Sequence, residues 1–94
     1  MNEKELTKYL VKKVKEKGGE ARKLSYEGRT GAPDWMILFP NKIIFVELKT
    51  EGKKASPSQV KEIALLQSLG FEAHVVDNPT LLDKVLENYG TSIY

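Results

Sequence analysis

One segment of the sequence, residues 34–48, constrains the fold more than any other. Residues 34–39 and 42–48 are two runs rich in aromatic and β-branched residues, and Pro40-Asn41 separates them. Two runs of this composition around a short turn are typical of a β-hairpin. Because proline cannot adopt a positive φ at the first turn position, we expect a connection based on a type I turn.

A connection of two or four residues centred on Pro40-Asn41 fixes the register of the hairpin. Asp34 then lies opposite Glu47, and Lys49 points to the same side of the sheet. Directly opposite residues have Cβ atoms only about 4.5–5.5 Å apart, and two like charges at that distance are destabilising unless a positive charge lies between them. Either this end of the hairpin is solvated and holds a cross-strand ion pair, or the three residues work together as a site.

The second alternative predicts a metal site. Mg²⁺ is typically held by one or two carboxylates together with waters and substrate phosphate oxygens. Asp34 and Glu47 are the expected ligands, and the backbone carbonyl of Leu48 would supply another oxygen. The chemistry that follows is metal-assisted hydrolysis of a phosphodiester, in which Lys49 would orient the attacking water or hold the developing charge on phosphorus. We expect no organic cofactor.

Composition limits the class of protein. A chain of 94 residues with a net charge of +2 predicts one domain, residues 1–94, with a modest core. The absence of cysteine excludes disulfides, thiolate metal sites and cysteine nucleophiles. Because a small secreted domain would usually contain disulfides, we expect a cytoplasmic protein. No apolar stretch approaches the roughly 18–20 residues that span a membrane, and we expect no membrane partner.

The remaining elements follow from apolar spacing and turn residues. Beyond the two strands of the hairpin, we expect a helix over 3–17, a strand over 20–26, a helix from Ser56-Pro57 to Gly70, a strand over 71–76 and a helix over about 80–89. A helix between the third and fourth strands permits a parallel crossover. The order α-β-β-β-α-β-α therefore predicts an α/β fold with a mixed sheet flanked by helices.

The first helix contributes a weaker candidate for the site. Its apolar spacing places Glu3 on the inward face, from which Glu3 would reach the pocket as a further ligand or base. The alternative is an ordinary carboxylate that interacts favourably with the helix dipole.

Four basic residues lie on strand or loop segments beside the predicted site. They are Lys23, Arg29, Lys53 and Lys54. Lysine and arginine contacts to phosphates give sequence-independent affinity for nucleic acid with strong salt dependence. We expect these residues to bind the DNA backbone, although plain solubilising charge is the alternative.

The residues resemble a known family. Pro33-Asp34, followed by Glu47-Leu48-Lys49, resembles the PD-(D/E)XK nuclease signature, and "GRTGAPDWMIL", "IIFVELKT", "ASPSQ" and "LGFEAHVV" are similar to its VRR-NUC branch. That branch is found alone in phages and fused to the C-terminus of Fanconi-anemia-associated nuclease. The resemblance covers roughly residues 3–77, although a Val-Arg-Arg pattern is not obvious in this chain.

The resemblance implies a restriction-endonuclease-like α-β-β-β-α-β core, here with an added C-terminal helix, and a Mg²⁺- or Mn²⁺-dependent DNA endonuclease. It implies that Asp34 and Glu47 are metal ligands, that Lys49 is the catalytic lysine and that Gln59 lies near the active site. It places a helix-one glutamate at Glu3, with Glu5 left open. Stand-alone members are similar to homodimeric resolvases of four-way (Holliday) junctions, so we expect a homodimer that cuts branched DNA. If a phage encodes the protein, its cytoplasmic location would be the cytoplasm of the host cell. A flap-cutting, nicking or restriction-type nuclease and a non-catalytic module that binds branched DNA are the alternatives.

Overall fold

The computed structural model describes residues 1–90 of the chain. Its elements are α1 (Glu3–Glu16), β1 (Glu20–Lys23), β2 (Trp35–Phe39), β3 (Lys42–Leu48), α2 (Pro57–Ser68), β4 (Glu72–Val76) and α3 (Pro79–Leu86). The predicted element order is confirmed. None of the helices in this part of the chain has the length and apolar character needed to cross a membrane.

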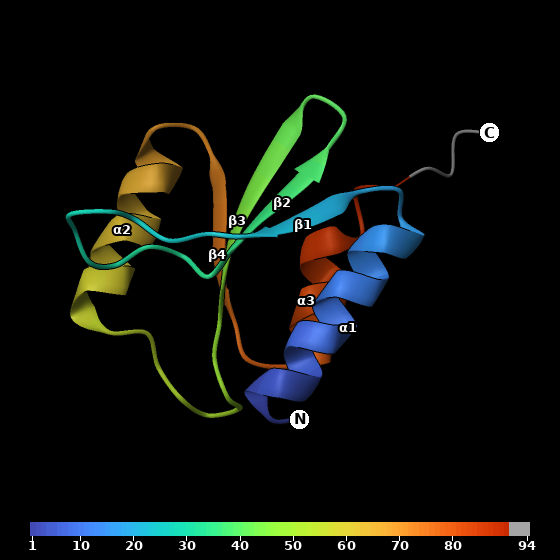
Figure 1. Cartoon of the computed structure of the whole chain (residues 1–94), viewed down its shortest axis with the longest axis horizontal. Coiled ribbons are helices and arrows are strands. Elements are labelled where there is room, and N and C mark those ends of the chain that lie inside the picture. The colour runs from blue at the N-terminus through green and yellow to red at the C-terminus, as the bar shows by residue number, and fades with distance from the viewer. Residues whose placement is uncertain (91–94) are drawn as a thin grey trace.

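The four strands form one mixed sheet in the order β1-β2-β3-β4. The first three strands pair antiparallel, and β3 pairs parallel with β4. The crossover between β3 and β4 contains α2, which lies on one side of the sheet, whereas α1 and α3 lie together on the other side (Figure 1). The predicted mixed sheet with helices on its faces is confirmed.

The two faces of the sheet bury cores of different size. The larger core joins α1 and α3 to the sheet and consists of Leu6, Leu10, Val14, Ile37, Phe39, Ile44, Val46, Leu48, Val76, Leu82 and Leu86. The smaller core lies under α2 and contains Ile63, Leu66 and Ala73, with Phe45 and Val75 packed against it. Because side chains alternate along a strand, Glu47 lies between the core residues Val46 and Leu48 and faces the α2 side.

The hairpin has the predicted register, because Phe39 pairs with Lys42 and Trp35 pairs with Val46. The predicted turn type is wrong. Asn41 has a φ of 59°, whereas a type I turn has a negative φ at its second central position. A positive φ there belongs to type II, which accepts proline at the first central position and asparagine at the second.

The first strand and the last helix differ most from their predicted bounds. The first strand ends at Lys23 rather than at residue 26, because the chain leaves the sheet there and Tyr26 hydrogen-bonds to Glu62 of α2. The last helix is shorter than predicted and begins at Pro79, since the side chain of Asn78 caps it by accepting a hydrogen bond from the Leu81 N–H at 2.8 Å.

Candidate active site

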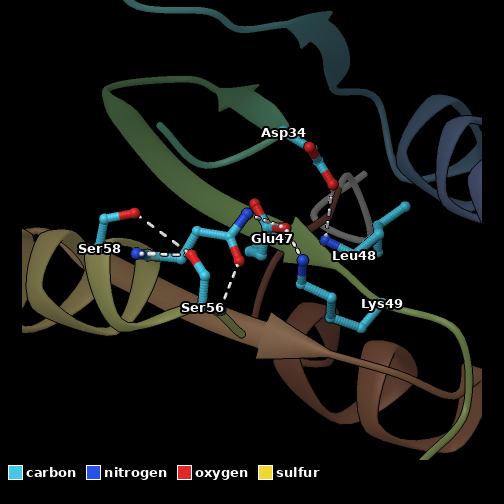
Figure 2. Close-up of polar contacts among 7 residues, drawn as sticks. Asp34, Glu47, Leu48, Lys49, Ser56 and Ser58 are labelled. Atoms are coloured by element: carbon cyan, nitrogen blue, oxygen red, sulfur yellow. Dashed lines mark hydrogen bonds and ion pairs between the residues drawn. The ribbon is translucent and has the colours of Figure 1, made fainter. Parts of the chain in front are cut away.

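The end of the hairpin away from its turn brings Asp34, Glu47 and Lys49 together (Figure 2). Asp34 immediately precedes β2, Glu47 lies near the end of β3, and Lys49 follows β3. The observed register continues outward from the pair formed by Trp35 and Val46, so the next opposed positions are Asp34 and Glu47. The opposition of the two carboxylates that the hairpin predicted is present in the structure.

Glu47 is buried, with only 1% of its surface exposed, and its two carboxylate oxygens have different surroundings. Oε2 accepts a hydrogen bond from Gln59 Nε2 at 2.8 Å and forms an ion pair with Lys49 Nζ at 2.9 Å. Oε1 is buried and has no hydrogen-bond partner among the residues that the structure describes. Most buried polar atoms in proteins have a partner, so this oxygen is a candidate ligand atom.

The electrostatic environment of Glu47 disfavours its negative charge. Burial raises the pKa of the Glu47 carboxyl, the nearby charge of Asp34 raises it further, and Lys49 acts in the opposite direction. Lys49 alone therefore does not compensate for the burial of this carboxylate beside a second one. A cation at the pair would relieve both effects.

Asp34 is held at its backbone and at its side chain. Its carboxylate Oδ2 accepts a hydrogen bond from the Leu48 N–H at 3.2 Å, and its carbonyl oxygen accepts one from the Leu24 N–H at 2.9 Å. The first contact attaches the Asp34 side chain to the strand that carries Glu47.

Gln59 links the N-terminus of α2 to Glu47. Ser56 caps the helix, and Gln59 completes a capping box in which its Oε1 accepts a hydrogen bond from the Ser56 N–H at 2.8 Å. That contact orients the amide so that Nε2 donates to Glu47. The structure thus brings Gln59 to the site, where the sequence resemblance placed it.

The two glutamates of the first helix do not complete a metal-binding group. Among residues 1–90, no set of three histidine, aspartate or glutamate side chains is arranged to hold a metal ion. Glu3 is exposed in the first turn of α1, and Glu5 accepts a hydrogen bond from the Asn2 N–H at 2.9 Å in a capping box. The role of Glu3 as a further ligand or base, with Glu5 as the alternative, stays a prediction.

The four predicted DNA-binding residues lie in different places. Lys23 pairs with Trp35 and lies over its ring, 5.1 Å from the centroid, on the α1 side of the sheet and so on the face opposite Glu47. Its predicted position beside the site is wrong, because the register of β1 turns this side chain away. Arg29 forms an ion pair with Glu62 at 3.3 Å, whereas Lys53 and Lys54 are exposed in the segment after β3.

Glu62 and Tyr26 were not among the site residues predicted from the sequence. Glu62 is 7% exposed and accepts a hydrogen bond from Tyr26 Oη at 2.6 Å. Helical spacing contained a signal, because Glu62 lies three residues from Gln59 and four from the buried Leu66, on the same side of the helix. A glutamate on the buried side of a helix indicates a partner within the protein.

This arrangement matches the class of protein that the resemblance implied. The mixed sheet in this element order, with Pro33-Asp34 opposite Glu47 and with Lys49 two residues later on the same side, agrees with the core expected for the PD-(D/E)XK class.

Comparisons with known proteins identify the branch of this class. The VRR-NUC domain model matches residues 1–78. The chain is 43% identical over 82 residues to "Putative nuclease p44" of Acyrthosiphon pisum secondary endosymbiont phage 1, a match that covers 86% of this chain and 88% of that protein. A solved structure described as a VRR_NUC domain superposes with a TM-score of 0.84 at 39% identity and covers 93% of this chain and 96% of its own. The chain belongs to the VRR-NUC family.

Proposed function

We propose that this protein is a metal-dependent endonuclease that hydrolyses phosphodiester bonds in branched DNA, with four-way junctions as its preferred substrate. The observation that carries the proposal is the buried carboxylate of Glu47. It lies opposite Asp34 and contacts Lys49 and Gln59 through one oxygen, whereas its other oxygen has no hydrogen-bond partner among the described residues. A phage relative that carries the name of a nuclease supports the same class of activity.

The residues present fit a hard divalent cation. An unpaired buried carboxylate oxygen beside a second carboxylate is a ligand set that Mg²⁺ or Mn²⁺ accepts. Asp34 and Glu47 would hold the ion, together with the carbonyl of Leu48. When bound, the ion would polarise the scissile phosphate and acidify a water molecule.

The protein's own side chains have separate tasks in this proposal. Lys49 keeps its ammonium group beside Glu47, where it would orient the attacking water and stabilise the negative charge that develops on the phosphate. Gln59 holds Glu47 Oε2, so that Oε1 remains the free acceptor. The Leu48 N–H fixes the Asp34 carboxylate.

Binding of DNA would rest on exposed cations near this end of the sheet. Lys53 and Lys54 lie in the segment after β3, and the Arg29 side chain is 63% exposed although it contacts Glu62. Contacts of this kind to phosphates would bind DNA irrespective of sequence and would weaken as salt rises. Lys23 is left out, since it lies on the other face of the sheet.

The preference for branched DNA is tied to a homodimer. Two copies related by a two-fold axis present two active sites in opposed orientations, and a four-way junction offers two opposed strands to cut. Flap cutting, nicking and restriction-type cleavage use the same chemistry, so substrate comparison separates them from junction resolution.

Asp34→Asn tests the proposal because asparagine keeps an acceptor for the Leu48 N–H and removes the charge. Cleavage of a labelled junction should fall by about 100-fold or more, whereas binding, measured by gel shift, should be retained or tighten as repulsion of phosphate is lost. Glu87→Gln, at an exposed position after α3, is the matched control and should cut normally. Unchanged cleavage by Asp34→Asn would contradict the assignment. Binding without cleavage by the unaltered protein would favour a non-catalytic binding module.

A further inference from the structure

The segment between β1 and β2 ends at Asp34 and lies against α2. Residues 24–34 reach across from the sheet to this helix (Figure 1). The hydrogen bond from the Leu24 N–H to the Asp34 carbonyl oxygen closes the base of the segment. The position of Asp34 therefore depends on how this segment is held.

A buried carboxylate holds the segment at its far end. Glu62 of α2 accepts a hydrogen bond from Tyr26 Oη on Oε2 at 2.6 Å and one from Arg29 Nη2 on Oε1 at 3.3 Å. Both oxygens thus contact residues of the 24–34 segment. Burial and the adjacent carboxylate raise the pKa of Tyr26 to about 12, so the phenol remains a donor at neutral pH.

Close packing also holds the 24–34 segment against α2. Pro33 is fully buried. Gly31 has a φ of +94°, and a Cβ atom at Gly31 would lie 2.6 Å from the Ser58 carbonyl oxygen in the first turn of α2. The segment lies directly on the helix, with no space for even a methyl group.

The same helix also holds the other carboxylate. Gln59 donates to Glu47, and Glu62, three residues later, binds the segment that ends at Asp34. Residues three apart lie on one side of a helix. The helix is itself anchored to the sheet through the buried Ile63 and Leu66.

We propose that Glu62 is a positioning residue of the active site. By holding Tyr26 and Arg29, it fixes residues 24–34 on α2 and thereby sets the position of Asp34 relative to Glu47. The consequence for catalysis rests on the proposed nuclease function, whereas the mechanical link does not. Arg29 has a structural role in addition to the phosphate contact proposed for it, because its guanidinium neutralises Glu62 while the rest of the side chain is exposed.

The experiment uses Glu62→Gln and Tyr26→Phe, with Glu27→Gln as the matched control. Glu27 is an exposed glutamate of the same segment. The primary readout is hydrogen exchange of the Leu48 amide by NMR, without metal or DNA, because this amide donates to Asp34. Exchange should accelerate by about tenfold or more in both variants and stay unchanged in the control.

Two further readouts test the consequence for the site. The affinity for Mn²⁺, measured by electron paramagnetic resonance, should weaken by about tenfold in both variants. Single-turnover cleavage should also slow, and in Tyr26→Phe the Kd for junction DNA should change by a smaller factor than the cleavage rate. If Glu62→Gln does not fold, Tyr26→Phe carries the test alone, since it removes one hydroxyl and keeps the charge.

Unchanged Leu48 exchange in a folded variant would overturn the proposal. Faster exchange without any cleavage by the unaltered protein would uphold the positioning link and would refute the nuclease function instead. A loss of thermal stability with unchanged Leu48 exchange and Mn²⁺ affinity would reduce Glu62 to an ordinary structural residue.

Discussion

At the residue scale, the unequal surroundings of the two Glu47 oxygens are central to the site. One oxygen contacts both Lys49 and Gln59, and the other is buried without a described partner. The free energy cost of such an atom is about 1–3 kcal/mol when nothing satisfies it. A buried polar atom without a partner in the protein is found at sites where a bound ion or ligand supplies the missing contact.

Variants of Ser56 and Gln59 can distinguish the effect of capping α2 from the effect of the hydrogen bond to Glu47. Ser56→Ala removes the cap and should lower the free energy of unfolding by about 0.5–2 kcal/mol, yet the Ser56 N–H still orients Gln59. Gln59→Ala keeps the cap, because its backbone N–H still donates to Ser56 Oγ, but it removes the side-chain donor to Glu47 and should slow cleavage by about tenfold. Urea unfolding and single-turnover cleavage of both variants check this prediction. Equal cleavage rates would show that Gln59 serves only the helix.

Contacts between site residues could be predicted from the sequence only where a short turn joins the two residues. The opposition of Asp34 and Glu47 followed from hairpin length alone, because pairing across a short turn is fixed by counting residues. The contact of Glu62 with Tyr26 joins residues 36 apart in the chain, and no local pattern indicates that pairing. The position of Lys23 failed for a similar reason, since the register of β1 against β2 is set by a long loop.

At the element scale, the contact between the 24–34 segment and α2 leads to a second prediction. Gly31 and Gly28 both have a positive φ, but only at Gly31 does an added Cβ meet another part of the chain. An alanine in a left-handed conformation costs about 1–2 kcal/mol, so both Gly28→Ala and Gly31→Ala should destabilise the protein. Gly31→Ala should lose more stability and should also slow cleavage, because the segment must move away from Ser58. Chemical unfolding and cleavage assays of the pair measure the difference.

The prediction would be contradicted if both alanine variants lost the same stability and cut DNA equally fast. That result would mean that the segment adjusts to the methyl group without displacing Asp34.

The carboxylate of Glu72 ties Tyr89, which follows α3, to the sheet, and the strength of this contact depends on pH. Glu72 of β4 accepts a hydrogen bond from the Tyr89 hydroxyl, lies within hydrogen-bond distance of His74 Nε2 at 3.1 Å and forms an ion pair with Lys42 at 3.7 Å. The Tyr89 hydrogen bond is the main cause of a lowered Glu72 pKa, and His74 and Lys42 lower it further. A lowered pKa in the folded state means that this stabilisation is complete above the unfolded-state pKa and is lost as the pH falls through the folded-state value.

Thermal stability should therefore decline as the pH is lowered below about 4.5, the ordinary value for glutamate. Glu72→Gln should be less stable than the unaltered protein at pH 7, and the difference should shrink by pH 3. Melting temperatures of both proteins across this range test the prediction. A constant difference over the whole range would contradict it.

Elements were more predictable than their ends. Apolar periodicity and the capping residue Ser56 located α2 correctly, and aromatic and β-branched runs located β2 and β3. The end of β1 was missed because Leu24 and Tyr26 look like strand residues, whereas Tyr26 is held by a helix distant in sequence. The turn type was wrong because the prediction followed the more common type I turn, whereas Asn41 adopts the left-handed φ that asparagine tolerates.

At the scale of the whole molecule, α2 connects the two halves of the site. It forms the crossover between β3 and β4, holds Glu47 through Gln59 and holds the segment that ends at Asp34 through Glu62. The sheet supplies the opposed carboxylates, and the helix fixes them relative to each other. This division explains how a domain with a modest core can keep a buried carboxylate opposite a second, half-buried one.

The surface offers apolar area for an assembly. Large apolar side chains remain exposed on and next to α2, among them Val60, Leu65, Leu69 and Phe71. Sequence patterns could not predict that these side chains are exposed, because their exposure depends on how the helix lies on the sheet. The partner that would cover them could therefore not be predicted either. The proposed homodimer accounts for such exposure in general terms.

The most direct test is cleavage of a labelled synthetic four-way junction beside matched duplex, flap and single-stranded DNA. The unaltered protein and Lys49→Ala are assayed with Mg²⁺, with Mn²⁺ and with EDTA. We expect paired nicks near the junction that require the metal and are lost in Lys49→Ala. Cleavage of flaps alone would retain the chemistry and refute the junction preference. Cleavage that persists in EDTA or in Lys49→Ala would contradict the central claim that Asp34, Glu47 and Lys49 form a metal-dependent nuclease site.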